Sequence, residues 1–436
     1  MSFPFSGRTV EAYRGKLPQK AEVVVIGGGV IGISAALSLA GQGISVVVVE
    51  KGLVGAEQSS RNWGWLRTQG RAEPEIPIAQ EAQRLWANLA PQLDCDIGLS
   101  QVGTLYLAQD EADLGRYEDW HEMAKPYGVA SQLCGPAEIA QHLPGATRSW
   151  VGGIFTATDG RAEPWQAVPA MGRYARKLGV RIFEGCAVRT LDIAAGRVAG
   201  VVTEAGRIAA SSVILAGGAW SSLFLRNHGI TLPQLCVRAT VGATQPLSEV
   251  NPGPVGQPGL AWRRRDDGGY TIAPSRRENF HIGPDAFRHL WAYRKVVAQQ
   301  WRGLRFHLTS PKGFPDGWRT RRSWGTEDTT PFEAMRILDP PPDLKELQRT
   351  ADRLAKLFPA LGAVNVDAAW AGMIDTMPDE VPVVDQVATL PGLTIATGMS
   401  GHGFGVGPAF GRIAAELATG AAPDHDLSAF RLARFD

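Results

Sequence analysis

The sequence predicts an α/β fold that begins with a Rossmann-like, dinucleotide-binding unit. Three observations predict it: a strand, glycine turn, helix and strand pattern over Val23–Val49, the acidic residue Glu50 directly after it, and 51 glycines gathered in short clusters. At about 150 residues per domain, the length of 436 residues predicts two or three domains. The 44 basic and 43 acidic residues give a net charge of +1, which argues against a nucleic-acid partner.

The stretch Val23–Val49 carries no charge and is long enough to cross a membrane as a helix. Its residues nevertheless divide into a strand at Val23–Ile26, a short helix at Val30–Ala40 and a second strand at Ile44–Val49. We therefore expect a βαβ unit and no transmembrane segment. The first residues lack the pattern of a cleavable leader, so we expect a cytoplasmic protein. The four cysteines are far apart without a CxxC pattern, which predicts reduced thiols and no metal site.

Gly27, Gly29 and Gly32 have the spacing of the dinucleotide fingerprint, at the point where the first strand passes into the helix. The first glycine allows a tight turn, the second lets the backbone approach a pyrophosphate, and the third lets helix and strand pack closely. The start of the helix, Val30 and Ile31, then faces the phosphates. Glu50 is expected to accept hydrogen bonds from a ribose hydroxyl. The pattern predicts a dinucleotide without separating FAD from NAD.

Four further segments follow along the chain. After Glu50 the chain enters a loop instead of another βα repeat, and three more segments come later. They are Lys51–Trp65 with a Ser-x-Arg-Asn-x-Gly pattern, Asp159–Pro164 before a helix to Lys177, Val213–Ser221, and Gly392–Gly405 before a helix through Ala418. In this order they resemble the D-amino-acid oxidase superfamily of FAD-dependent amine oxidoreductases, which includes glycine oxidase, sarcosine oxidase and the D-amino-acid dehydrogenases. Ordered matches over nearly the whole chain are more specific than one motif.

The resemblance implies FAD as the cofactor. The cysteine that carries covalent flavin in sarcosine oxidases has no evident counterpart here, so we expect the FAD to be non-covalent. Strands around Val180–Phe183, Cys186–Leu191 and Arg197–Val202 resemble a second layer over the cofactor. The implied FAD contacts beyond the fingerprint are Lys51, Ser59, Ser60, Arg61, Asn62, Gly64, Trp65, Val188, Gly217, Gly218, Trp220, Gly372, Gly401, His402, Gly403, Phe404 and Gly405.

The same segments imply two interleaved domains. Residues 1–85, 151–228 and 365–436 would form the FAD-binding domain, and residues 86–150 and 229–364 a substrate-binding domain. The resemblance implies an antiparallel sheet that roofs the flavin in this second domain. Tyr270, in a strand-like segment, and Trp324 are candidates for substrate contact. The arginine clusters at 263–265, 276–277 and 321–322 are expected to be solvated faces, because the net charge is small.

Two positions depart from the family pattern for binding a substrate carboxylate. Ile374 occupies the position at which glycine and D-amino-acid oxidases carry the arginine that binds the carboxylate. Gly405 occupies the position at which sarcosine oxidases carry the lysine that binds it. Either Arg67 or Arg71 replaces these anchors, since a guanidinium suits a planar carboxylate, or the substrate is an amine without a carboxylate. In the second case an apolar pocket would include Ile374, and Asp375 is a candidate for meeting a distal cation.

The resemblance implies an enzyme that oxidises the C–N bond of an amino acid or amine to an imine, by hydride transfer to flavin N5. The imine then hydrolyses to a carbonyl product, and oxygen, a quinone or an electron-transfer partner accepts the electrons. His402 is a candidate for stabilising reduced flavin or contacting substrate. One alternative is a flavin-binding subunit of a hetero-oligomeric amine or opine-type oxidoreductase with limited activity alone, and another is a nicotinamide enzyme.

Overall fold

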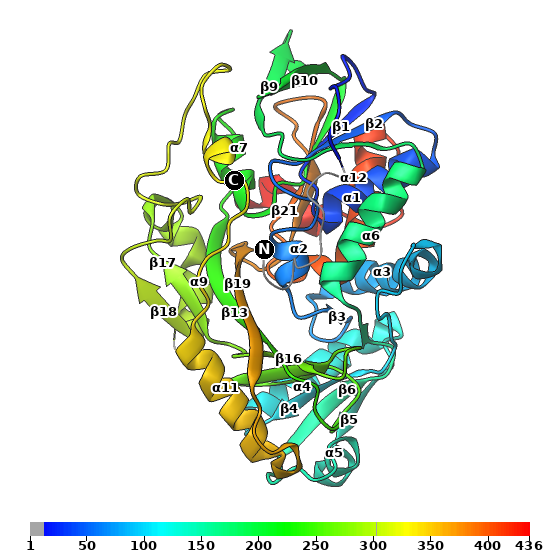
Figure 1. Ribbon diagram of the computed structural model, residues 1–436, viewed down its shortest axis with the longest axis vertical. Helices are drawn as coiled ribbons and strands as arrows, with labels where there is room; N and C mark the ends of the chain where they lie inside the picture. The colour runs from blue at the N-terminus through cyan, green and yellow to red at the C-terminus, as the bar shows by residue number, and fades with distance from the viewer. Residues whose placement is uncertain (1–12, 302) are drawn as a thin grey trace.

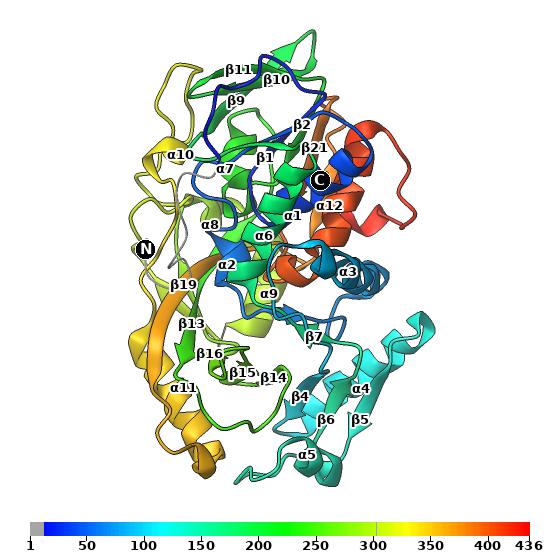
Figure 2. The same ribbon diagram turned by 45° about the vertical axis from the view of Figure 1, so that its right-hand side comes forward.

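Two large sheets organise the molecule (Figures 1 and 2), and the computed structural model describes residues 13–301 and 303–436. The six-stranded sheet lies in the upper half of Figure 1 and the ten-stranded sheet in the lower half. Strands of both sheets come from segments far apart in the sequence.

The six-stranded sheet contains the predicted βαβ unit. Its strands are β1 (Val23–Ile26), β2 (Val46–Val49), β8 (Arg181–Phe183), β12 (Ser212–Leu215), β20 (Val383–Gln386) and β21 (Leu393–Thr397). Their order is β20-β21-β12-β1-β2-β8, and all neighbours are parallel except β20 and β21. The prediction of strand, helix and strand over this stretch is confirmed.

Both faces of this sheet are covered, which explains its uninterrupted valine runs. Val23 and Val25 belong to one core, whereas Val24 and Ile26 belong to the other. The first core lies under four helices: α1 (Val30–Gly41), α3 (Ile76–Leu89), α6 (Pro164–Lys177) and α12 (Gly403–Thr419). The second lies under a three-stranded antiparallel sheet and a short helix: β9 (Val188–Ala194), β10 (Arg197–Thr203), β11 (Gly206–Ala209) and α7 (Ser221–Arg226).

The ten-stranded sheet forms the wall opposite the βαβ unit. Its strands are β4 (Thr104–Ala108), β5 (Ser131–Cys134), β6 (Gly152–Thr156), β13 (Leu235–Thr244), β14 (Val255–Gln257), β15 (Leu260–Arg264), β16 (Tyr270–Ala273), β17 (Glu278–His281), β18 (Leu304–His307) and β19 (Val366–Thr376). Their order is β18-β17-β13-β16-β15-β14-β4-β6-β5, with β19 paired to β13. Neighbours are antiparallel apart from the pairs β4–β14 and β17–β18.

The amphipathic helix α11 (Leu344–Leu357) covers this sheet, and it runs beside β13 and β19 in Figure 1. The remaining helices and strands are α2 (Gln58–Arg61), α4 (Glu111–Ala124), α5 (Pro136–His142), α8 (Pro284–Arg288), α9 (Leu290–Gln300), α10 (Pro331–Ala334), β3 (Trp65–Leu66) and β7 (Gly160–Arg161). Figure 2 shows α4 and α5 beside β4, β5 and β6 at the lower end of the molecule.

Two strands lie in a different sheet from the one that the domain ranges imply. β6 and β19 fall in the ranges assigned to the FAD-binding domain, yet both are strands of the ten-stranded sheet. β19 pairs with β13 from Val366 to Thr376, and this long-range pairing decides its place. Residue ranges follow the chain, whereas sheet membership follows such pairings, so the boundary between the two parts runs through the predicted ranges.

No helix within residues 13–301 and 303–436 combines the length and the apolar character that a membrane span requires.

Candidate functional site

A cavity of about 370 Å³ lies between the two large sheets. Ile26, Val49 and Leu215, at the carboxyl ends of the parallel strands β1, β2 and β12, line one side of it. Ala239 and Val241 of β13 line another side. Ligands of open parallel sheets bind at the carboxyl ends of the strands. We therefore take this inner cavity as the candidate site.

Gly27 and Gly32 have the structural roles that the fingerprint spacing predicts, and the approach of a pyrophosphate to Gly29 stays a prediction. Gly27 has a φ of +107°, and a Cβ there would overlap the carbonyl oxygen of Ala216, so the turn after β1 requires glycine. A Cβ on Gly32 would overlap the carbonyl oxygen of Gly27, so glycine lets α1 pack against the turn. Gly29 lines the inner cavity. The turn thus presents bare backbone to a ligand, as a pyrophosphate requires.

Glu50 lies at the end of β2 and lines the inner cavity. Its Oε2 accepts a hydrogen bond from the Gly28 N–H at 2.7 Å, and its Oε1 accepts one from the Gly52 N–H at 2.7 Å. Burial raises the pKa of Glu50, while the Lys51 charge and these two N–H groups oppose the rise. Each carboxylate oxygen has a further lone pair, so Glu50 retains the capacity to accept hydroxyl hydrogens.

Two helix N-termini from opposite ends of the chain face the inner cavity. α1 begins at Val30, whose N–H donates to Ser59 Oγ at 2.9 Å, and α12 begins at Gly403. Figure 1 shows α1 in blue beside α12 in red. The loop before α12, from Met399 to His402, lines the cavity together with Gly403, Phe404 and Gly405 in the first turn of the helix. Free N–H groups and the positive ends of two helix dipoles therefore favour an anionic or electron-rich ligand here.

A polar cluster closes one edge of the cavity. Lys51 Nζ donates to Glu57 at 2.6 Å and lies 4.4 Å from the centroid of the Trp220 ring. Trp220 Nε1 donates to the same carboxylate at 2.9 Å. Lys51 also donates to the carbonyl oxygens of Met335 and Arg336. These contacts fix the side chains of Lys51 and Trp220 at the cavity edge.

Arg61 and Asn62 mainly hold the loop that carries them. Arg61 is 4% exposed, and its Nη1 donates to Asp339 at 2.6 Å and to the Ala371 carbonyl at 2.9 Å. Asn62 donates to the Ser59 carbonyl at 2.9 Å and accepts from the Gly64 N–H at 2.8 Å. The loop is therefore tied to β19, while both side chains still line the cavity.

Most of the predicted cofactor residues come together around this one cavity. The residues that line it are Gly27, Gly29, Val30, Ile31, Glu50, Lys51, Ser59, Arg61, Asn62, Trp65, Val188, Gly217, Gly218, Trp220, Gly372, Gly401, His402, Gly403, Phe404 and Gly405. Gly32, Ser60 and Gly64 do not line it. Ser60 is fully buried, and Gly64, with a φ of +76°, packs against Ala162 and Arg263. The contacts of the individual residues with a cofactor stay predictions.

A second, outer cavity of about 1330 Å³ adjoins the first. Eight residues line both cavities and so mark the junction between them: Trp63, Trp65, Arg67, Tyr106, Glu278, Ile374, Ser400 and His402. No sequence pattern indicates Tyr106 or Glu278, because each lies on a strand of the ten-stranded sheet, remote in sequence from the cofactor motifs.

Arg67 and Arg71 lie where an arginine anchor for a substrate carboxylate is needed, the first of the two possibilities that the sequence leaves open. Both line the inner cavity, and Arg71 is only 3% exposed. Its Nη1 is buried and has no hydrogen-bond partner in the described part of the chain. Burial, with the neighbouring Arg67 charge, lowers the pKa of Arg71 to about 9. A buried guanidinium with a free N–H in a cavity wall favours an incoming anion.

Asp159 fixes the loop between these two arginines. It accepts hydrogen bonds from the Thr68 N–H at 2.7 Å, the Gln69 N–H at 3.2 Å and Gln83 Nε2 at 2.9 Å. Arg67 donates to the Gln69 carbonyl and lies over the ring of Tyr106 at 5.6 Å. The position of the guanidinium groups thus depends on Asp159, a residue from the segment before α6.

His402 lies at the junction, directly before α12. Its Nδ1 is 3.4 Å from Oε1 of the buried Glu75. Burial, with the Arg71 charge, lowers the pKa of His402 to about 4. The imidazole is therefore neutral near pH 7, and a cationic histidine is not the group that faces the cavity.

Tyr270 and Trp324 lie away from both cavities, in contrast to their prediction as substrate contacts. Tyr270 is fully buried under α11, and its hydroxyl accepts from the Val250 N–H at 2.9 Å and donates to the Ser248 carbonyl at 3.1 Å. Trp324 packs against Phe332 and donates to the Arg189 carbonyl at 2.7 Å. Both aromatic side chains serve the core, which is the usual role of large aromatic residues.

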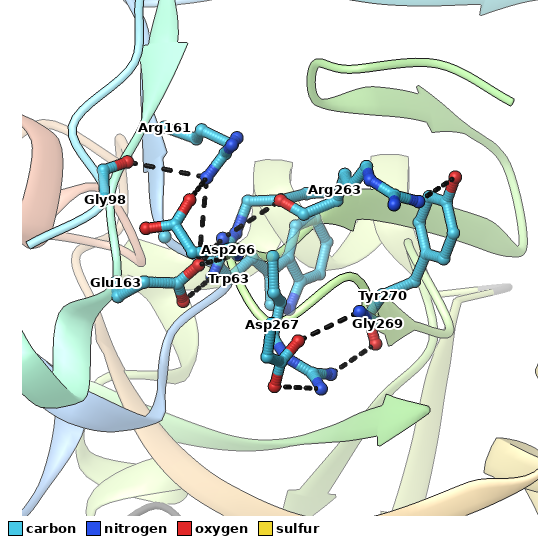
Figure 3. Close-up of polar contacts among 12 residues, drawn as sticks. Trp63, Gly98, Arg161, Glu163, Arg263, Asp266, Asp267, Gly269 and Tyr270 are labelled. Carbon is cyan, nitrogen blue, oxygen red and sulfur yellow. Dashed lines mark hydrogen bonds and ion pairs between the residues drawn. The ribbon is translucent and has the colours of Figure 1, made fainter. Parts of the chain in front are cut away.

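The expectation of a solvated arginine cluster at 263–265 is wrong for two of its members. Arg263 is 0% exposed and Arg265 5% exposed. Figure 3 shows Arg263 paired with Glu163, through N···O distances of 2.7 and 2.8 Å, while its Nε donates to the Trp63 carbonyl. Glu163 comes from the start of α6, 100 residues earlier, so no local pattern indicates the pair. The ion pair joins β15 to the start of α6, and the hydrogen bond from Nε joins β15 to the segment that carries Trp63.

Asp375, the candidate for meeting a distal cation, lines the inner cavity, and its carboxylate already has protein partners. It is 2% exposed, and its Oδ2 accepts from the Gly398 N–H at 2.9 Å and from Gln234 at 3.1 Å. Its neighbour Ile374 does lie at the junction, where it supplies an apolar wall. Within the described residues, no cluster of His, Cys, Asp or Glu has the arrangement of a metal site.

Comparisons with known proteins give the family. The family model "DAO: FAD dependent oxidoreductase" matches residues 22–417. The L-amino acid deaminase from Proteus myxofaciens, solved in complex with anthranilate, has a TM-score of 0.92 at 31% identity, over 98% of this chain and 96% of that chain. The L-amino acid deaminase from Proteus vulgaris has the same TM-score of 0.92 and identity of 31%, over 98% of this chain and 100% of its own.

Two groups of curated relatives are more distant. Sarcosine oxidase subunit beta from Rhizobium meliloti (strain 1021) is 24% identical over 95% of this chain and 88% of its own length. The matches to the mitochondrial sarcosine dehydrogenases of Mus musculus and Homo sapiens cover only 26% of those longer proteins. Because the family model spans most of the chain and its solved members share the whole fold, this protein belongs to the family of FAD-dependent oxidoreductases.

Proposed function

We propose that this FAD-dependent oxidoreductase oxidises the C–N bond of an α-amino acid to an imine, and that Arg71 anchors the substrate carboxylate. The observation that carries the proposal is the free, buried Nη1 of Arg71 in the wall of the inner cavity. Of the two possibilities left open by the sequence, it favours a substrate with a carboxylate. Anthranilate, the ligand of the solved Proteus myxofaciens deaminase, also carries a carboxylate.

The inner cavity fits FAD as its dinucleotide. A Cβ at Gly27 or Gly32 would collide with backbone, so the turn is built to bring bare backbone to the pyrophosphate. Glu50 faces the cavity with free acceptor capacity for ribose hydroxyls. Gly401 and His402, directly before α12, and the first turn of this helix, Gly403 to Gly405, supply donors and a positive dipole end for the flavin. Non-covalent binding is part of the proposal, since no cysteine is among the residues that line the inner cavity.

In this proposal the chain's own residues orient the substrate and keep it reactive. Bound FAD supplies the oxidant, a hydride acceptor that takes two electrons and one hydrogen from the α-carbon. Arg71, with Arg67 beside it, holds the carboxylate and so places the α-carbon at the junction. Trp65, Tyr106 and Ile374 surround that position with apolar surface, which favours the neutral amine that can lose a hydride. The nitrogen lone pair forms the C=N bond as the hydride leaves, which gives the protonated imine, and this imine later loses its proton to water.

The imine then reacts with water, which gives a 2-oxo acid and ammonia when the substrate is a primary amine. Oxygen, a quinone or an electron-transfer partner takes the two electrons in a later step. The outer cavity adjoins the junction and is the route by which we propose that substrate arrives and product leaves.

An anaerobic reduction experiment tests the proposal. Purified holoprotein is mixed without oxygen with a panel of L- and D-amino acids and with the amine that each yields on decarboxylation, and flavin absorbance is followed. We expect bleaching by at least one amino acid and at least tenfold slower bleaching by its decarboxylated partner. Equal rates for every such pair would contradict the carboxylate anchor, and no bleaching by any compound would contradict the reaction.

A second candidate function is that of a flavin-binding subunit in a larger oxidoreductase. The similarity over 88% of a protein named as sarcosine oxidase subunit beta favours it. Full turnover by the isolated chain would exclude this candidate, whereas a rate that rises many-fold only in the presence of a co-purifying partner would support it.

A further inference from the structure

One acidic side chain stands at the junction of the two cavities. Glu278 lines both, and among the eight junction residues it is the only acid. It is the first residue of β17, which pairs with β13 in the ten-stranded sheet. Arg67, the only guanidinium among the same residues, comes from the loop after β3 on the cofactor side.

The sheet register shows that Glu278 faces the cavities. Val237 of β13 pairs with Phe280 on one side and with Ile374 on the other, and all three side chains line the outer cavity. Residues two apart on a strand point to the same face, so Glu278 shares the face of Phe280. This wall is otherwise apolar at Val237, Phe280 and Ile374, and Glu278 is the one acid among the described residues that lines both cavities.

The Glu278 carboxylate lacks a protein partner. It makes no hydrogen bond or ion pair with any other residue among those described, although it is half-buried. Five arginines of the outer cavity are already paired with other acids: Arg116 and Arg276 with Asp113, Arg277 and Arg353 with Glu346, and Arg305 with Asp343 and Glu346. The sixth, Arg67, donates to the Gln69 carbonyl and lies over the Tyr106 ring. Burial, with the charge of Glu380, raises the pKa of Glu278 to about 7. A half-buried carboxylate is costly without a cation, so the wall is incomplete without one.

We propose that Glu278 binds a positively charged group at the far end of the substrate side chain, which makes basic α-amino acids of the lysine type the preferred substrates. This inference rests on the proposed function and specifies its substrate class. The carboxylate of such a substrate pairs with Arg71, its apolar carbons lie against Ile374 and Tyr106, and its distal ammonium reaches Glu278. The two ends of the substrate thus meet opposite charges on opposite walls.

The distal group, and not the α-amino group, is the partner of Glu278 for a chemical reason. An ion pair with the α-ammonium would stabilise the protonated amine, which has no lone pair to drive hydride loss. A distal ammonium stays charged throughout the reaction, so its ion pair stabilises bound substrate without opposing the chemistry. The place of Glu278 at the border of the outer cavity, away from the parallel strands, agrees with this assignment.

The first test compares lysine with norleucine, which differs only by lacking the distal amine. Anaerobic flavin reduction is measured for the holoenzyme, for Glu278→Gln and for Glu118→Gln, a matched control on the exposed surface of α4. We expect the wild-type protein to reduce at least tenfold more efficiently with lysine than with norleucine. Glu278→Gln should abolish this preference by slowing flavin reduction by lysine alone, whereas Glu118→Gln should keep the preference.

The second test measures binding without turnover. The ligands are 6-aminohexanoate, which is lysine without the α-amine, and hexanoate, which keeps the carboxylate but lacks the distal ammonium. Calorimetry gives the Kd of each on the oxidised holoenzyme. We expect 6-aminohexanoate to bind at least tenfold more tightly than hexanoate to the wild-type protein and with no preference to Glu278→Gln. FAD content equal to wild type shows that the variant is folded.

The outcomes separate this inference from the proposed function. If neutral amino acids bleach the flavin as well as lysine does, or if Glu278→Gln slows norleucine and lysine equally, the inference is wrong and the oxidation of amino acids stands. If no amino acid bleaches the flavin of the wild-type protein, the proposed function itself fails. Equal Kd values for 6-aminohexanoate and hexanoate would overturn the role of Glu278 in either case.

Discussion

The two sides of the inner cavity are built in different ways. On the cofactor side, the cavity is lined largely by backbone. The glycine turn after β1, the N-termini of α1 and α12, and the residues directly before α12 face the cavity. On the side where we propose that substrate binds, side chains line the cavity, and Arg71, Tyr106, Glu278 and Ile374 come from separate elements. A backbone cradle suits a cofactor that all family members share, whereas side chains can change with the substrate.

The largest effect is expected from a side chain added to the cradle. In Gly32→Ala the new Cβ would overlap the Gly27 carbonyl oxygen, so α1 must move away from the turn. We expect the Kd for FAD to rise at least a hundredfold, as measured by flavin release and fluorescence titration. The matched control is Gly41→Ala at the other end of α1, where a Cβ meets nothing within 4 Å and FAD affinity should be unchanged. Tight FAD binding by Gly32→Ala would contradict this account of the turn.

The second largest effect is expected from the buried ion pair between Arg263 and Glu163. Arg263→Met leaves the buried Glu163 carboxylate without its guanidinium and frees the Trp63 carbonyl (Figure 3). Breaking a buried pair from one side costs about 3–5 kcal/mol of unfolding free energy, which chemical denaturation of the holoprotein would detect. The double variant Arg263→Met/Glu163→Gln should recover part of the loss. A single variant as stable as wild type would show that the pair contributes nothing net.

A smaller effect is expected when the arginine loop is loosened. Asp159→Asn keeps the size of the side chain but removes the charge that accepts from the Thr68 and Gln69 N–H groups. We expect KM for an amino acid to rise about tenfold, with FAD content and kcat near wild type, because the loop positions Arg67 and Arg71 without touching the flavin cradle. A fall in kcat at constant KM would place Asp159 in the chemistry instead.

The smallest effect concerns pH and His402. Its pKa is lowered by burial to about 4 in the folded protein, below its ordinary value of 6.5, so the unfolded state binds the proton more strongly. The stability of the wild-type protein should therefore fall as pH drops from about 6.5 to about 4, and His402→Asn should lose less over that range. Thermal unfolding of both proteins at pH 7 and pH 5 measures this difference. Identical losses of Tm would mean that His402 titrates as it does in water.

The contrast between the two sides also explains what the sequence could predict. The glycine turn, Glu50 and the loop before α12 are local patterns, and each is confirmed as part of one cavity. Arg67 and Arg71 could also be predicted as residues of the cavity, because they follow the Ser59–Trp65 segment directly in the sequence. Membership of β19 in the ten-stranded sheet, the burial of Arg263 against Glu163, and the meeting of Tyr106 with Glu278 depend on pairings over long distances in sequence. Local pattern and composition carry no information about such pairings.

The central claim is that Arg71 holds the carboxylate of an amino acid beside FAD. The most direct test is anaerobic flavin reduction of the wild-type protein and of Arg71→Met by one reactive amino acid and by its decarboxylated amine. We expect the variant to lose about a hundredfold to a thousandfold in efficiency with the amino acid, as for removal of a charged partner from a buried pair, and little with the amine. An equal loss on both substrates, with FAD still bound, would contradict the claim.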